Sequence, residues 1–140
     1  MEHRGDAGSD TETVAGDVAL IAWLARHHKR PFSEAALRAS LPSGIDLNRP
    51  AELARALGHL SLNARQVTVA PTAIDPSALP CVVQRNDGSR VILLRIADRG
   101  RGFVVVDPLA GDLEVEHSRR DFRRGFTSQV LLVSEQDDRR

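Results

Sequence analysis

The chain contains a single cysteine, Cys81, and a thiol can act as a nucleophile where a neighbouring base takes its proton. The histidines that could serve as that base are His27, His28, His59 and His117. Cys81, however, directly follows Pro80 and opens the apolar segment at residues 81–83, which is typical of a buried strand. A cysteine in such a segment usually packs as a small apolar residue, so the sequence favours a structural role for Cys81.

The histidines do not have the spacing of a metal site. His27 and His28 are adjacent, so on a helix their side chains point about 100° apart. His59 and His117 are isolated in the sequence, which does not match the spacing of zinc ligands. The glycines fall in expected turns, and none forms a phosphate-binding pattern before a helix. We therefore expect no metal and no cofactor in this chain.

Composition limits the class of protein. The 140 residues suit one domain, and the 19 basic residues balance the 19 acidic ones. A neutral chain lacks the broad basic field of nucleic-acid binding proteins, so no nucleic-acid partner is expected. The longest apolar run, residues 18–25, is too short to span a bilayer, which needs about 20 residues. The predicted organisation is a flexible tail at residues 1–15, a domain at 16–134 and a linker stub at 135–140.

Three helices are expected in the first half of the chain. Residues 18–25 are apolar on all sides, which predicts a buried helix, with Asp17 as its N-cap. A second helix follows the cap Ser33, and a third has Pro50 in its first turn. The residues expected to face inward from the second and third helices are Ala36, Leu37, Leu41, Leu53, Leu57 and Leu60.

Strands are expected after residue 60. Residues 62–69 predict an edge strand, and 81–83, 91–96 and 103–106 predict central strands covered on both faces. Residues 113–116 alternate as a half-exposed strand does, and 129–133 predict the last strand. Between these two, Ser118 and Asp121 form a capping box before a short helix that buries Phe122. The order predicts an α+β fold, with N-terminal helices on an antiparallel meander of about five or six strands.

Residues 16–134 resemble the cysteine peptidase domains that cut leaders from bacteriocin precursors, and their relatives at the N-termini of type I secretion ABC transporters. The resemblance rests on four short motifs in the same order and spacing. They are the helix ending Leu24-Ala25-Arg26-His27-His28, Pro80, the turn Asp87-Gly88, and Asp107-Pro108. What it implies about the fold is a papain-like arrangement, with a buried N-terminal helix against the sheet.

The resemblance also implies where catalytic residues would lie, and this chain departs from the pattern there. The nucleophile position falls at about Gly16, the upstream glutamine position near Asp10, and the histidine position at Arg90. A guanidinium does not act as a base in proteins, so we expect a degenerate site without catalysis. Asp107 matches the family's aspartate. It either forms a static ion pair with Arg90 or only makes the turn before Pro108.

The resemblance is strongest to the cysteine-free version of this domain in exporters of RTX toxins and large adhesins. It implies a docking domain that engages the unfolded export substrate on the cytoplasmic face of the bacterial inner membrane. Gln84, Arg90 and Asp107 are the expected contacts with the substrate. The implied partners are the transmembrane and nucleotide-binding domains of the same transporter, together with a periplasmic adaptor and an outer-membrane channel. ATP and Mg²⁺ would belong to the full-length transporter.

Two alternatives remain open. One is a cysteine peptidase with displaced residues, which would use Cys81 and one of the histidines to cleave a leader peptide. The other is a regulatory domain that controls the transporter ATPase. Separately, the basic segment at residues 118–124 has two interpretations, a solvated helix face or a surface for an acidic partner.

Overall fold

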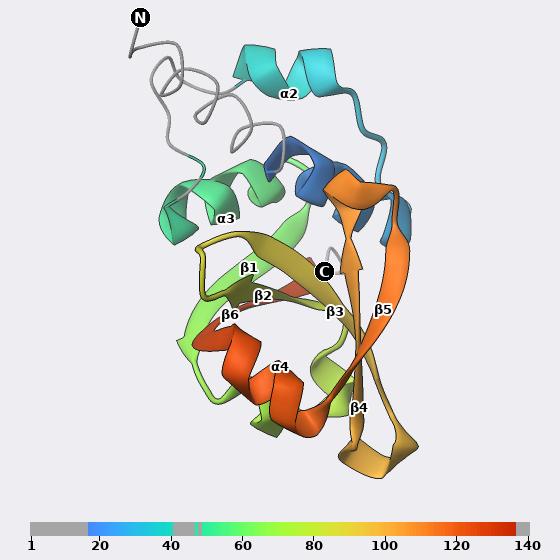
Figure 1. The fold of residues 1–140 in the computed structure, drawn as a ribbon. Coiled ribbons are helices and arrows are strands. Elements are labelled where there is room, and N and C mark those ends of the chain that lie inside the picture. Colours follow the sequence, from blue (N-terminus) through green and yellow to red (C-terminus); the bar gives the residue numbers. More distant parts are fainter. Residues whose placement is uncertain (1–16, 41–46, 48, 137–140) are drawn as a thin grey trace, which may run out of the picture.

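A six-stranded antiparallel sheet with helices on both faces forms the fold (Figure 1). The computed structural model describes residues 17–40, 47 and 49–136. The strands are β1 (Leu62–Thr68), β2 (Cys81–Arg85), β3 (Arg90–Ala97), β4 (Gly102–Asp107), β5 (Leu113–Ser118) and β6 (Phe126–Glu135). Each strand predicted from the sequence is present, and all neighbouring pairs run antiparallel.

The strand order is β1-β6-β2-β3-β4-β5, so the predicted meander is only partly right. Strands β2 to β5 follow one another, but β6 returns and lies between β1 and β2. The burial of β6 explains this position, because Val130 is buried on one face while Leu131 and Val133 are buried on the other. A strand that is apolar on both faces needs a central place, whereas β1 alternates with polar residues and forms an edge, as expected.

The N-terminal helices cover one face of the sheet. They are the helix at residues 17–27, α2 (Glu34–Ser40) and α3 (Pro50–Gly58). Ser33 caps α2 as expected, with its hydroxyl accepting a hydrogen bond from Ala36 N at 3.2 Å. Ala36 itself is exposed, so its predicted inward position is wrong, while Leu37 is buried. The core on this face joins the helices to side chains of the sheet, including Leu62, Val82, Ile92, Val106, Leu131 and Val133.

The short helix α4 (Arg119–Gly125) and the 3₁₀ turn η1 (Pro71–Ala73) cover the opposite face. Ser118 caps α4 as predicted, accepting from Asp121 N at 3.1 Å. Phe122 is fully buried and stacks on Phe103 with ring centroids 4.6 Å apart. The central strands β2, β3 and β4 are therefore covered on both faces, as their apolar sequences predicted.

The predicted domain boundaries, at residues 16 and 134, lie close to the two ends of the described residues. Strand β6 runs to Glu135, and Gln136 N donates to Ser61 O at 3.1 Å, so these two residues belong to the fold and not to a linker. The predicted tail at 1–15 lies outside the described residues, as do Asp10, Gly16 and Leu41. Among the described residues, no helix is both long and apolar enough to cross a membrane.

Candidate functional site

An ion pair joins the first helix to the sheet. Arg90, the first residue of β3, places Nη1 3.6 Å from Asp17 Oδ1. The same Nη1 donates to the carbonyl oxygen of Leu47 at 3.4 Å. Only 8% of each of the two charged side chains is exposed, so the pair lies inside the protein.

Asp17 is the first described residue of the helix at residues 17–27. A buried carboxylate needs a cation nearby, which Arg90 supplies. The sequence predicted Asp17 only as a helix cap. Two sequence features could have indicated this ion pair. One is an acidic residue before a fully apolar helix, and the other is an arginine before an apolar strand.

Arg90 and Asp107 lie on opposite faces of the sheet, which excludes the first of the two alternatives for Asp107, an ion pair with Arg90. Side chains alternate along a strand, so Arg90 shares the helix-covered face with Ile92, whose cross-strand partner is Val106. Asp107 follows Val106 and therefore faces the α4 side. There its Oδ2 accepts from Arg85 Nη1 at 3.4 Å.

The turn role of Asp107 is the alternative that the structure supports. Its Oδ1 accepts from Leu109 N at 3.0 Å, which fixes the turn through Pro108. Gln84, the third expected contact, is half-buried on β2 directly opposite Arg90. The three residues assigned to substrate contact therefore do not converge: Gln84 and Arg90 share one face of the sheet, and Asp107 belongs to the other.

Cys81 lies in the core beneath α4, with no exposed surface. Burial raises the pKa of its thiol from the ordinary value of 9.0 to about 12. His117 on β5 is three strands away in the sheet, a separation of about 14 Å at the usual strand spacing. Cys81 thus has the structural role that the sequence favoured, in a place where a thiolate is strongly disfavoured.

The helix histidines have other contacts. His28 Nδ1 lies 3.0 Å from Glu135 Oε2. His27 stacks on Trp23 with ring centroids 5.2 Å apart, and its pKa is lowered, first by burial and then by the charge of His28. Within the described ranges, no group of three or more histidine, cysteine, aspartate or glutamate side chains is arranged to hold a metal ion.

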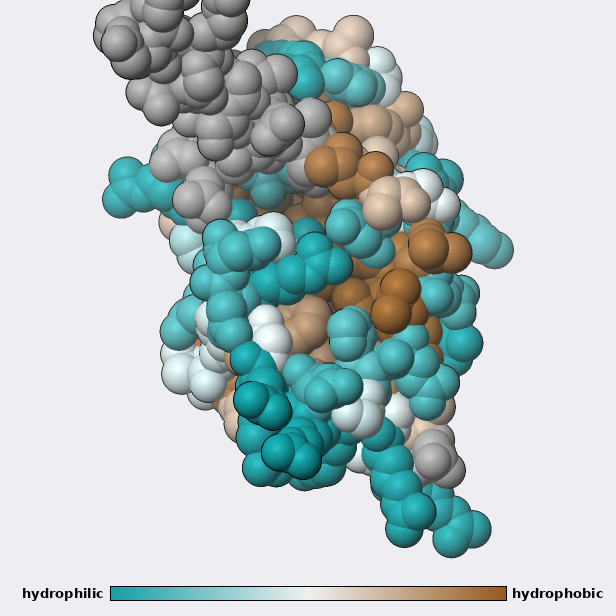
Figure 2. All heavy atoms as spheres, in the orientation of Figure 1, coloured by the Kyte–Doolittle hydropathy of each residue, from teal (hydrophilic) through white to brown (hydrophobic). Residues whose placement is uncertain are grey.

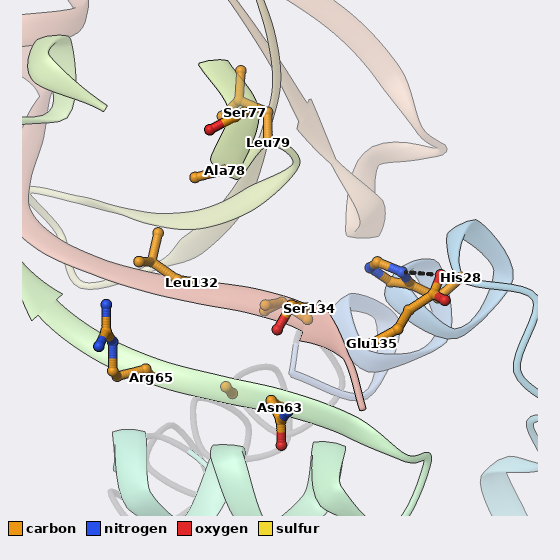
Figure 3. A pocket seen from close by; sticks show the side chains of 11 residues that line it. His28, Asn63, Arg65, Ser77, Ala78, Leu79, Leu132, Ser134 and Glu135 are labelled. Atoms are coloured by element: carbon orange, nitrogen blue, oxygen red, sulfur yellow. Dashed lines mark hydrogen bonds and ion pairs between the residues drawn. The ribbon is translucent and has the colours of Figure 1, made fainter. Parts of the chain in front are cut away.

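A groove of about 610 Å³ opens beyond the C-terminal end of the first helix. Figure 3 shows its lining, with Leu132 and Arg65 from β6 and β1, Leu79 from the connection before β2, and the bonded pair His28 and Glu135 at one end. No pattern in the sequence indicated this groove, because its lining comes from segments far apart in the chain.

The sequence model of the Peptidase C39 family matches residues 12–138. The chain belongs to the Peptidase C39 family. The family resemblance and the papain-like α+β fold expected from the sequence are thereby confirmed. A comparison with curated proteins gave no match.

Solved C39 domains share the fold of this chain. The N-terminal peptidase C39 like domain of the toxin secretion ATP-binding protein from Vibrio parahaemolyticus superposes with a TM-score of 0.74 at 21% identity, covering 86% of this chain and 97% of that one. A double glycine motif protease from an AMS/PCAT transporter, solved with its leader peptide, has a TM-score of 0.70 at 18% identity, with 86% and 84% covered. The peptidase domain of Streptococcus ComA, a bi-functional ABC transporter, has a TM-score of 0.68 at 19% identity, with 86% and 91% covered.

In this C39 domain, the Asp17–Arg90 pair occupies the corner where the sequence resemblance located the nucleophile and the base. The nucleophile position was assigned to about residue 16, one residue before Asp17, and the base position to Arg90. A carboxylate and a guanidinium at this corner attract each other, but neither is a thiolate or a proton acceptor of the imidazole type.

Proposed function

We propose that this C39 domain is a non-catalytic docking domain of an ABC transporter, which holds an unfolded segment of an exported protein without cutting it. Support for the transporter comes from its structural neighbours, which are described as parts of a toxin secretion ATP-binding protein, an AMS/PCAT transporter and the bi-functional ABC transporter ComA. One of these neighbours was solved with a leader peptide, which supports a polypeptide as the ligand.

The observation that carries the proposal is the buried ion pair between Asp17 and Arg90. A cysteine peptidase needs a thiolate beside a base at this corner. The chain has one cysteine, and its thiol is buried in the core on the opposite face of the sheet. The same facts weigh against a displaced peptidase site built on Cys81.

In this proposal the segment binds beside Gln84, on the half-buried surface of β2 next to the first helix. Arg90 lies beneath that surface and supports it. Its guanidinium contacts Asp17 and the carbonyl oxygen of Leu47, and only 8% of the side chain is exposed. Asp107 shapes the turn on the other face and contributes no direct contact there. Binding should be weak, since ordering a flexible segment costs conformational entropy.

The proposed context is type I secretion of an RTX-type substrate. The transmembrane and nucleotide-binding domains of the same transporter would be the permanent partners, and they would bind ATP and Mg²⁺. A periplasmic adaptor and an outer-membrane channel would complete the export path. The docking domain would then act at the cytoplasmic face of the inner membrane.

An NMR titration of the 140-residue protein tests the proposal. An unfolded, calcium-free segment of an RTX-type substrate should shift amide signals around Gln84, and the calcium-folded form should not. Gln84→Lys should weaken binding about fivefold through lost contacts, a change of roughly 1 kcal/mol. The matched control is Asn63→Lys on the edge strand β1, which is exposed, pairs with Ser134 and is separated from β2 by β6, and it should bind as the wild type does.

Preferential binding of the folded substrate would contradict the docking proposal. An unchanged spectrum with either form, together with a change in ATPase rate of the full transporter when the domain is deleted, would instead favour a regulatory domain.

A further inference from the structure

The outer edge of β5 carries an apolar surface that the fold leaves open. Leu109, Leu113 and Val115 are 58%, 65% and 45% exposed, and they are the exposed large apolar side chains of the described residues. They come from β5 and from the turn η4 (Pro108–Ala110) directly before it. Figure 2 shows brown atoms at the surface on the side of the molecule where β4 and β5 lie. Grouped apolar exposure of this kind is a feature of binding surfaces.

Successive side chains of β5 point to opposite faces of the sheet. Val115 is opposite Val105 and Leu113 is opposite Asp107, so both face the α4 side. Glu114 and Glu116 face the other side. α4 has only seven residues, and its buried Phe122 covers Phe103. The Leu113 end of β5 therefore stays uncovered on the α4 face.

The backbone of β5 is available as well as its side chains. β5 is the last strand in the sheet order and pairs only with β4 among the described strands. An edge strand directs every second pair of backbone N–H and C=O groups away from the sheet. An extended segment can satisfy these groups by adding itself as a further strand.

The far end of β5 is strongly basic. The backbone N of Arg119 donates to Arg101 O at 3.0 Å, which brings the start of α4 against the β3–β4 hairpin. The exposed arginines of these two segments are Arg99, Arg101, Arg119, Arg120, Arg123 and Arg124. Within the described residues, none of the six has a carboxylate within ion-pair distance. In Figure 2 the deepest teal lies over α4.

We propose that the outer edge of β5 docks an extended polypeptide segment with apolar residues at alternate positions and carboxylates at one end. The apolar residues pack on Leu113 and Val115, and the carboxylates lie beside Arg101 and Arg119. The inference rests on the proposed function only for the source of the segment, an exported protein. The β5 edge and the surface at Gln84 are different places on the molecule, so one long unfolded chain can contact both surfaces.

A second copy of this chain fits the edge poorly. Antiparallel pairing of two β5 strands about Val115 places Glu114 of one copy opposite Glu116 of the other, twice. Like charges in directly opposite positions destabilise a strand pair. Within each copy, Glu114 already forms an ion pair with Arg95 of the same sheet at 2.9 Å, so it does not need a partner from a second copy. Charge complementarity at the basic end therefore favours an acidic segment over self-pairing.

The test uses a synthetic ten-residue peptide in an NMR titration of the 140-residue protein. The peptide has valine and leucine at alternate positions, serine and threonine between them, and three glutamates at one end. Amide shifts should concentrate on residues 113–118 and the adjoining β4. A scrambled peptide of the same composition should bind about tenfold more weakly, the loss that corresponds to roughly 1.4 kcal/mol. Val115→Asp should have an effect of the same size.

Charge variants separate the basic end from general electrostatics. Arg101→Glu with Arg119→Glu should weaken the peptide about tenfold, and added salt should reduce the difference, because screening weakens exposed ion pairs. The matched control is Arg65→Glu, which changes an exposed arginine on the opposite edge strand β1 and should bind as the wild type does.

Four outcomes would overturn the proposal. Peptide shifts away from β5 would place the site elsewhere. Binding to anionic lipid vesicles that depends on the arginines but not on Val115 would indicate a membrane surface, and concentration-dependent shifts of β5 without peptide would indicate self-pairing. If unfolded substrate binds Val115→Asp as strongly as wild type, the β5 inference fails while docking at Gln84 stands. Cleavage of substrate would refute the proposed function without affecting the peptide result at β5.

Discussion

Asp17 and Arg90 form a buried ion pair, with 3.6 Å between Oδ1 and Nη1, that ties the head of the first helix to the start of β3. The corner they occupy is the one where the C39 resemblance places a nucleophile and a base. The opposite charges hold the helix and the sheet together at this corner. In the proposed docking function the pair keeps the shape of the corner, and it supplies neither a thiolate nor an imidazole.

Breaking this pair should destabilise the protein. Arg90→Met should lower the free energy of unfolding by about 3–5 kcal/mol, because it leaves Asp17 buried without its cation. Urea denaturation measures this quantity. The double variant Asp17→Leu with Arg90→Met removes both charges and should lose much less than the sum of the two single variants.

The matched control for Arg90→Met is Arg85→Met. Arg85 pairs with Asp107 at 3.4 Å, but the two side chains are 35% and 31% exposed. Screening by solvent should limit the loss to less than about 1 kcal/mol. Equal losses for Arg85→Met and Arg90→Met would show that burial does not distinguish the two pairs.

The thiol of Cys81 should be almost unreactive in the folded protein. With its pKa raised to about 12, the thiolate fraction at pH 8 is about one in ten thousand. Alkylation by iodoacetamide should therefore be at least about 100-fold slower in the native protein than in urea. Rapid alkylation of the native protein at pH 8 would show that the thiol is accessible and ionised.

The same shift predicts a loss of stability at high pH. The raised pKa of Cys81 favours the protonated thiol in the folded state, so its contribution is complete below the ordinary value of 9.0. It is lost as the pH rises from about 9 towards 12, since the unfolded chain ionises first. Cys81→Ala should remove this part of the pH dependence, as measured by urea denaturation at several pH values.

The pKa of His27 should respond in opposite directions to changes in its two charged neighbours. Burial lowers this pKa below 6.5, the charge of His28 lowers it further, and Glu135 raises it. His28→Gln should therefore raise the pKa of His27, and Glu135→Gln should lower it. NMR titration of the imidazole protons measures both, and shifts of the same sign would refute the assignment of these causes.

The α4 face of the core should depend on Phe122. This side chain is fully buried and stacked on Phe103, so Phe122→Ala should cost about 3–5 kcal/mol of unfolding free energy. Ser118→Ala removes only the helix cap and should cost about 1 kcal/mol. Thermal or urea unfolding measures both, and a larger loss for Ser118→Ala would contradict this order.

Local patterns in the sequence were sufficient to predict most elements. The apolar strands at 91–96 and 103–106 and the cap at Ser118 are properties of consecutive residues, and all three are present. The position of β6 between β1 and β2 depends on pairing between segments more than 40 residues apart, as Val82 and Leu131 show on one side and Gln66 and Leu131 on the other. No local pattern contains that information.

The candidate site was harder to predict because it depends on which face each side chain occupies. One residue of register separates Val106, on the helix side, from Asp107, on the α4 side. From the sequence, Asp107 could either pair with Arg90 on the neighbouring strand or only make the turn before Pro108. The actual partner of Arg90, Asp17, is 73 positions earlier in the chain, and the two meet only because the helix packs on the sheet.

The most direct measurement is a cleavage assay with the 140-residue protein and a leader peptide that carries a double-glycine motif, followed by mass spectrometry. We expect the peptide to remain intact over hours, while NMR detects binding of unfolded substrate beside Gln84. Specific cleavage that disappears in Cys81→Ala would contradict a docking domain in which the Asp17–Arg90 pair has replaced the catalytic groups.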